Sequence, residues 1–201
     1  TIDAANSGTT IRIATAISTL SSDKIVLTGD SSLKKRPMQP LLDALESLDA
    51  KCSSSNGNPP ISISGKIKGG EVKISGSVSS QFISALMITA PKLEKGLILN
   101  IQNKLVSKPY IDATIAAMKK FGAEVKIKTA YKKYIIDKQD YKSTTFAIPS
   151  DFSSLALLLS AAVLLGADLT IQISSGSMPQ ADEAIQDILT IMGVVITCPF
   201  N

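Results

Sequence analysis

The sequence predicts an α/β protein built from repeated β-α-β-α-β-β units, with buried helices and outer sheets. One observation is a repeat of about 70 residues, which places matching hydrophobic and proline positions in successive units. The matching positions are Leu27, Leu99 and Ile171 in middle strands, and Pro37, Pro109 and Pro179 at the second helices. The other observation is that residues 155–165 are apolar on nearly every side, so this helix is expected to be surrounded by protein. Helices packed inside sheets satisfy both observations.

Strands and helices are expected to alternate within each unit, because the spacing of apolar residues changes between two and about 3.6 residues. In the first unit, Gly8 lies where a helix begins, and Arg36-Pro37 opens a second helix with leucines along one side. The predicted elements are a helix over 8–20, a strand over 23–30, a helix after 36–37, a loop over 52–60 and a strand over 61–65. The loop is predicted from its Ser, Asn, Gly and Pro content.

The second and third units repeat this order. The second is predicted to contain a strand over 71–75, a helix over 79–90, a strand over 96–102, a helix over 110–121 and a hairpin over 124–128 and 133–137. The third is predicted to contain a strand over 145–149, a helix over 151–165, a strand over 168–173 and a helix over 184–192. Gly122 is expected to end its helix in a left-handed conformation.

The segment 76–91 joins a serine cluster to a strongly periodic apolar helix, with Ser79, Ser80 and Gln81 at its start. Serine hydroxyls cap the free N–H groups of a helix N-terminus, and this is an ordinary use of the residue. The same N–H groups also favour a bound phosphate or carboxylate. The segment alone therefore leaves helix capping and anion binding open.

Composition narrows the classes of function. The chain of 201 residues has 44% hydrophobic and 19% charged residues, which is the balance of an ordinary globular protein. Its net charge of +4 suits small anions, whereas the basic stripe and the stacking aromatics of a nucleic-acid binder are lacking. The sequence has no histidine, and Cys52 and Cys198 are interpreted as free thiols, so no metal and no cofactor are expected.

No leader-peptide pattern opens the sequence. The most apolar run, 155–166, is shorter than the roughly 20 residues that a membrane-spanning helix needs. We therefore expect a soluble, cytoplasmic protein with neither a membrane nor a nucleic-acid partner.

Several motifs, taken in order, resemble EPSP synthase, the 3-phosphoshikimate 1-carboxyvinyltransferase family. The first is G-S-V-S-S-Q-F at 76–82, and it is accompanied by N-S-G-T-T-I-R at 6–12, K-R-P-M at 35–38, V-S-K-P-Y-I at 106–111 and D-F-S-S at 151–154. The similarity covers essentially the whole chain but less than half of a complete enzyme. It implies the enolpyruvyl transferase fold, an inside-out α/β barrel, with two repeat units of one domain in 1–140 and a truncated first unit of the other domain in 141–201.

The chain departs from the family pattern at three positions where glycine is usual, namely Ala5, Asp49 and Ala181. Because glycine adopts positive φ at no steric cost, the backbone at these turns is in question.

The resemblance implies transfer of the enolpyruvyl group of phosphoenolpyruvate to the 5-hydroxyl of shikimate 3-phosphate, in the shikimate pathway of aromatic amino acid biosynthesis. The residues implied to bind shikimate 3-phosphate are Ser79, Ser80, Gln81, Ser107 and Tyr110. Those implied to bind phosphoenolpyruvate are Gly8, Arg36 and Gln81. No catalytic residue is expected in this part of the enzyme, which is expected to be inactive without the remainder.

Each of these residues also has a purely structural interpretation. Arg36 before a proline is commonly a solvated surface charge, and Tyr110 is an aromatic on a core-facing helix. Arg12 is expected to pair with a carboxylate, and Asp151 and Ser153 to cap a helix. Two further functions stay open. One is UDP-N-acetylglucosamine enolpyruvyl transfer, against which S-S-Q-F and S-K-P-Y argue, and the other is a non-catalytic half-protein that binds an anion.

Overall fold

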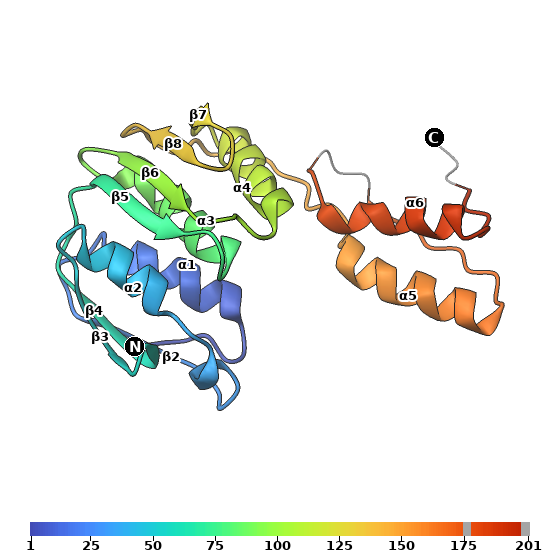
Figure 1. Cartoon of the computed structure of the whole chain (residues 1–201), viewed down its shortest axis with the longest axis horizontal. Helices are drawn as coiled ribbons and strands as arrows, with labels where there is room; N and C mark the ends of the chain where they lie inside the picture. Colours follow the sequence, from blue (N-terminus) through green and yellow to red (C-terminus); the bar gives the residue numbers. More distant parts are fainter. Residues whose placement is uncertain (175–177, 198–201) are drawn as a thin grey trace. The chain divides into compact units, whose positions relative to one another are not determined.

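The chain is described by a computed structural model that covers residues 1–174 and 178–197 (Figure 1). It divides into two compact units, Thr1–Thr144 and Thr145–Asn201. The division lies close to the boundary expected after residue 140. That these units belong to two different domains of an enzyme stays a prediction.

The first unit contains two copies of one topology. The first copy comprises β1 (Ile2–Asp3), α1 (Gly8–Ser18), β2 (Ile25–Thr28), α2 (Gln39–Glu46), β3 (Lys51–Ser55) and β4 (Asn58–Ser64). The second comprises β5 (Gly70–Ser75), α3 (Ser80–Thr89), β6 (Leu97–Gln102), α4 (Lys108–Lys120), β7 (Lys126–Thr129) and β8 (Lys133–Ile136). The strand orders are β1-β2-β4-β3 and β5-β6-β8-β7, with the first pair parallel and the others antiparallel in both sheets. The predicted β-α-β-α-β-β repeat is confirmed for these two copies.

Helices α1, α2 and α3 lie between the two sheets of the first unit, and α4 packs against α3 (Figure 1). Helix α3 is buried along most of its length, including Phe82, Ile83 and Met87, because its sequence is apolar on most sides. It packs against α1, whose Ile11 is fully buried. The predicted arrangement of buried helices and outer sheets therefore holds here, and it brings the first turns of α1 and α3 close together.

Two local predictions for the first copy are wrong. Residues 52–60 form most of the β3–β4 hairpin rather than a loop, because Asn56 and Gly57 take the positive φ angles, 51° and 77°, of a tight hairpin turn. The second helix begins at Gln39 and not directly after Arg36-Pro37. Arg36 is extended, with φ −88° and ψ 127°, as expected of a residue that precedes proline.

The glycine replacements do strain the backbone at two of the three positions. Ala5 and Asp49 have φ angles of 48° and 73°, in the left-handed region that favours glycine. Ala181 instead begins a short 3₁₀ turn, Ala181–Glu183, where a side chain has no such cost. Gly122 has the predicted left-handed conformation, with φ 78°.

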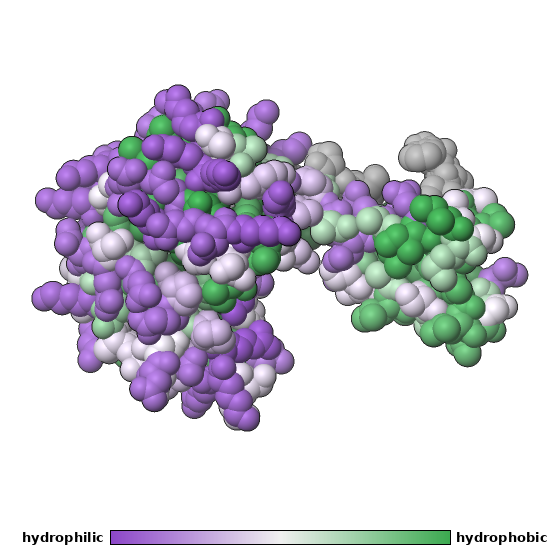
Figure 2. Space-filling model, in the orientation of Figure 1, coloured by the Kyte–Doolittle hydropathy of each residue, from purple (hydrophilic) through white to green (hydrophobic). Residues whose placement is uncertain are grey.

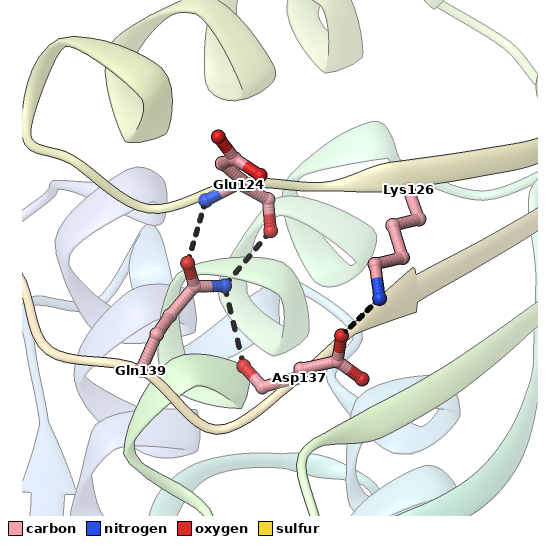
Figure 3. A network of polar contacts seen from close by, with 4 residues as sticks. All are labelled: Glu124, Lys126, Asp137 and Gln139. Atoms are coloured by element: carbon pink, nitrogen blue, oxygen red, sulfur yellow. Dashed lines mark hydrogen bonds and ion pairs between the residues drawn. The ribbon is translucent and has the colours of Figure 1, made fainter.

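The β7–β8 hairpin is closed by a small polar network (Figure 3). The Gln139 side chain accepts a hydrogen bond from the Glu124 backbone N–H at 2.8 Å and donates to the Glu124 carbonyl at 2.8 Å. Lys126 pairs with Asp137 across the hairpin at 2.5 Å. These contacts join the two ends of the hairpin, which confirms its prediction from the sequence.

The second unit contains α5 (Phe152–Leu165) and α6 (Ala184–Ile191). Asp151 caps α5, accepting hydrogen bonds from the backbone N–H groups of Ser153 and Ser154, and a bond from the Ser154 hydroxyl at 2.6 Å. These hydrogen bonds lower the pKa of Asp151. The predicted cap is confirmed for Asp151, whereas Ser153, which was also expected to cap, is the second residue of the helix. Ser153 also donates to Asp182, so its hydroxyl is occupied.

The strands predicted over 145–149 and 168–173 are not formed. Next to these segments, the backbone N–H of Ser174 donates to the Ser150 hydroxyl at 2.8 Å, and that of Ser150 donates to the Ser174 carbonyl at 3.4 Å. A parallel pair without further strands is marginally stable, and no third or fourth strand pairs with these segments in the part of the chain that the structure describes.

The prediction that α5 is surrounded by protein is also wrong for this chain. Only Phe152 and Leu155 of the helix are buried, whereas Leu157 and Leu164 are 75% and 85% exposed. The physical reason is the missing sheet, since no strand covers the helix within the described residues. Figure 2 shows the resulting hydrophobic surface over α5 and α6. None of the helices described is long and apolar enough to cross a membrane.

Candidate anion-binding site

The two serines at the start of α3 have different structural roles. Ser79 has an extended backbone and is the N-cap, and its hydroxyl accepts a hydrogen bond from the Gln81 backbone N–H at 3.3 Å. Ser80 is the first helical residue and is only 4% exposed. No described residue bonds to its hydroxyl. The capping interpretation therefore accounts for Ser79 but leaves the Ser80 hydroxyl available.

The first turn of α1 holds Gly8 beside an arginine. Ser7 caps this helix by accepting from the backbone N–H of Thr10 at 3.2 Å, and Gly8 is its first residue. The Nη1 atom of Arg36 lies 2.8 Å from the point where a Cβ on Gly8 would stand, and that of Arg12 lies 3.5 Å from it. A side chain at position 8 would therefore collide with Arg36. Glycine allows both guanidinium groups to gather at the helix N-terminus.

Gln81 joins the two helices. Its amide oxygen accepts a hydrogen bond from Nη1 of Arg12 at 2.5 Å, and its amide nitrogen donates to the Thr9 hydroxyl at 3.0 Å. These bonds span 69 and 72 residues of sequence. The N-terminus of α1 therefore brings together three residues that were predicted to bind one ligand, Gly8, Arg36 and Gln81.

The expected carboxylate partner of Arg12 is not there. Within the described residues the guanidinium bonds to the neutral Gln81 amide and lies over the Phe82 ring, 5.0 Å from its centroid. Its Nε is buried without a hydrogen-bond partner. Burial and the neighbouring Arg36 lower the pKa of Arg12. Sequence spacing could not reveal this, because the partners come from the helix of the next copy.

Ser107 and Tyr110 lie at the start of α4. Ser107 precedes the helix with φ 56° and ψ 46°, a strained conformation for serine, and its exposed hydroxyl does not cap the helix. The adjacent Val106 N–H donates to the Gly76 carbonyl at 3.0 Å, which holds this turn beside the segment leading to α3. Tyr110 is 49% exposed, so it is not the core aromatic of the structural interpretation. Among described residues neither bonds to Gln81 or Arg36.

In the part of the chain that the structure describes, no three His, Cys, Asp or Glu side chains are grouped so that they could hold a metal ion. Cys52 is a free thiol whose pKa is raised to about 11, chiefly by burial and also by Glu46 and Asp43. It is therefore protonated at neutral pH and poorly nucleophilic. Cys198 lies outside the described residues.

The site lies in an α/β protein built from β-α-β-α-β-β repeats. Two capped helix N-termini, two arginines without carboxylate partners among the described residues, and a free serine hydroxyl are groups that can hold an anion. The chain belongs to the EPSP synthase (3-phosphoshikimate 1-carboxyvinyltransferase) family, whose sequence profile matches residues 1–199.

Curated relatives and a solved structure agree with this assignment. The 3-phosphoshikimate 1-carboxyvinyltransferase of Nitrosopumilus maritimus is 59% identical over 195 residues, which are 97% of this chain and 46% of that protein. The protein of the same name from Methanosarcina mazei is 49% identical over 203 residues, 98% of this chain and 46% of its own length. EPSP synthase from Acinetobacter baumannii superposes with a TM-score of 0.65 at 27% identity, covering 80% of this chain and 35% of that one. The chain thus spans less than half the length of these relatives.

Proposed function

We propose that the enzyme to which this chain contributes transfers the enolpyruvyl group of phosphoenolpyruvate to the 5-hydroxyl of shikimate 3-phosphate and releases phosphate. The observation that supports this best is the gathering of Gly8, Arg36 and Gln81 from three separate family motifs. Both substrates are anions, and a site with two guanidinium groups that form no ion pair among the described residues suits them.

The proposed roles follow from what each group can donate. Ser80, Ser107 and the N–H groups at the start of α3 would bind the phosphate of shikimate 3-phosphate. Arg36 would form a bidentate pair with phosphoenolpyruvate, and Gly8 would allow that ligand to approach the α1 N-terminus. Gln81 would reach between both substrates, and Tyr110 would lie over the shikimate ring. Ser79 would act mainly through its cap.

The family assignment favours this reaction over UDP-N-acetylglucosamine enolpyruvyl transfer. A half-protein that binds an anion without chemistry is the remaining alternative, and the exposed apolar faces of α5 and α6 argue against it, because they need a cover. We propose that the rest of the enzyme covers those faces, that the complete protein is cytoplasmic, and that this chain alone binds shikimate 3-phosphate weakly.

An NMR titration of the 201-residue chain with shikimate 3-phosphate tests the binding half of the proposal. We expect backbone amide shifts concentrated at the start of α3 and around Ser107, and a weaker response in Ser80→Ala. Tyr141→Phe is a suitable control, because it removes a 2.8 Å hydrogen bond to the Ile88 carbonyl at the other end of α3. Shifts spread evenly over the lysines of the surface would contradict the proposed site.

A further inference from the structure

We propose that Arg12 is a positioning residue, whose guanidinium holds the amide oxygen of Gln81 so that the amide N–H groups are presented to the bound anion. This inference rests on the proposed function, because it concerns how the same site recognises its ligand. The inference goes beyond the proposed function because it gives Arg12 a role in binding, whereas the sequence motifs indicate only a structural arginine.

The orientation of the Gln81 amide is dictated by Arg12. A guanidinium carries only donors, so the amide atom that faces its Nη1 at 2.5 Å must be the oxygen. The Thr9 hydroxyl on the other side can donate or accept, and therefore imposes no orientation by itself. With the oxygen held, the amide nitrogen gives one hydrogen to Thr9 and keeps a second for another acceptor. Phosphate and carboxylate oxygens are acceptors, so this orientation fits an anion.

Arg12 is itself held firmly enough to do this. Its guanidinium lies 5.0 Å from the centroid of the Phe82 ring, and Phe82 is fully buried. The cation–aromatic contact holds the guanidinium against the ring, while its position on α1 is set by the packing of α1 against α3. The bond from Arg12 to Gln81 is thus made between two packed helices and not between two mobile surface side chains.

The surroundings of Arg12 argue against a simple structural ion pair. Among residues 1–174 and 178–197 no carboxylate pairs with it, and the guanidinium of Arg36 lies against the same Gly8. Keeping two like charges together costs free energy unless something negative offsets them. A bound anion at the α1 N-terminus would offset both charges, with Arg36 in direct contact and Arg12 acting through Gln81.

A double-mutant cycle in anion binding tests the inference with the chain as it is. Arg12→Met, Gln81→Met and the double variant would be titrated with phosphoenolpyruvate and with shikimate 3-phosphate, followed by NMR. If Arg12 works through Gln81, each single variant weakens binding by about 10-fold to 100-fold, the range for one hydrogen bond to a charged group, and the double variant is no weaker than Gln81→Met. Losses that multiply would mean that Arg12 acts on the ligand directly, and would overturn the proposal.

A second measurement needs no ligand. In the unmodified chain we expect a nuclear Overhauser effect between the Gln81 side-chain amide protons and the Thr9 methyl group, and slowed hydrogen exchange of one amide proton. Arg12→Met should abolish both, whereas the control Tyr141→Phe should lower the melting temperature and leave both intact. An unchanged Gln81 signal in Arg12→Met would overturn the positioning role. Failure of the unmodified chain to bind either anion would instead count against the proposed function, and the Gln81 signal would still decide this inference.

Discussion

The guanidinium of Arg36 lies against Gly8, with Nη1 only 2.8 Å from the place where a Cβ atom on that glycine would stand. Because Gly8 is a helical residue, alanine would fit its backbone well and a loss of stability from φ is not expected. We therefore expect Gly8→Ala to keep the free energy of unfolding within about 1 kcal/mol and to weaken phosphoenolpyruvate binding about tenfold by displacing Arg36. Adding Arg36→Met to this variant should cause little further loss of affinity. If the losses of the two single variants multiply in the double variant, displacement of Arg36 is not the cause of the weaker binding.

Ser79 and Ser80 give a matched pair of variants. Ser79→Ala removes the cap of α3 and should lower the free energy of unfolding by about 1 kcal/mol. Ser80→Ala removes a hydroxyl without a described partner, so it should affect stability less and weaken shikimate 3-phosphate binding by about 1.5 to 3 kcal/mol. Thermal melts and calorimetric titration of both variants would show this division. Unchanged affinity in Ser80→Ala together with a lowered melting temperature would favour capping for both serines.

The strain at Ser107 predicts opposite effects on stability and binding. A non-glycine residue at φ 56° and ψ 46° costs about 1 to 2 kcal/mol, and glycine relieves this cost. Ser107→Gly should therefore raise the melting temperature while weakening shikimate 3-phosphate binding through loss of the hydroxyl. Asn103→Gly is the control, since Asn103 also has positive φ, at 61°, in the same loop but is not part of the proposed site. Weaker binding in both variants would point to loop flexibility as the cause.

Equivalent turns after α2 and α4 allow a comparison within one chain. Ala50 bonds to the Leu45 carbonyl at 3.1 Å and Ala123 bonds to the Met118 carbonyl at 2.9 Å, so Asp49 and Gly122 occupy matching left-handed positions.

We expect Asp49→Gly to raise the free energy of unfolding by about 0.5 to 1 kcal/mol, because glycine adopts this conformation freely but also enlarges the unfolded ensemble. The reverse change, Gly122→Asp, should destabilise, because its Cβ would also lie 2.9 Å from the Lys142 side chain. Denaturant unfolding of both variants would check the two signs, and a destabilised Asp49→Gly would show that Asp49 makes a stabilising contact.

Much of the first unit was predictable because its signals are local. The repeat of about 70 residues and the periodic helices identified both copies of the fold, and the serine, glycine and proline positions marked where helices begin. The β3–β4 hairpin was missed although its signal, Asn56-Gly57, is local, because the surrounding serines and prolines resemble a loop. Its serines in fact alternate between exposed and half-buried positions of a strand.

The arrangement of the candidate site was less predictable. That Gly8, Arg36 and Gln81 converge depends on how α1 and α3 pack, and the bond between Arg12 and Gln81 joins residues 69 positions apart. Spacing along one helix therefore suggested a carboxylate partner for Arg12 that does not exist among the described residues. The prediction for the second unit was wrong for a related reason. Apolar composition indicated a buried α5 but does not reveal which residues would cover it.

The exposed apolar faces of α5 and α6 lead to the last prediction, which concerns turnover. The Nitrosopumilus maritimus relative is about twice as long as this chain, since the aligned residues make up 46% of it. We expect the 201-residue chain alone to release no phosphate from phosphoenolpyruvate and shikimate 3-phosphate. A complete site aligns the two substrates, and such alignment supplies effective molarities of about 10⁵ M or more. The part of the relative outside the alignment, produced together with this chain, should restore turnover and reduce the binding of a hydrophobic dye to α5 and α6.

The relative's part produced alone is the matched control and should also be inactive. Leu164→Glu, which places a charge on the exposed face of α5, should prevent restoration while leaving the weak binding of shikimate 3-phosphate by this chain unchanged, because Leu164 belongs to the second compact unit and the proposed binding residues to the first. A phosphate-release assay measures each combination. Turnover by the purified chain alone, at a rate near that of an intact relative, would show that the binding residues of this chain are sufficient for catalysis. It would refute the dependence on a second part.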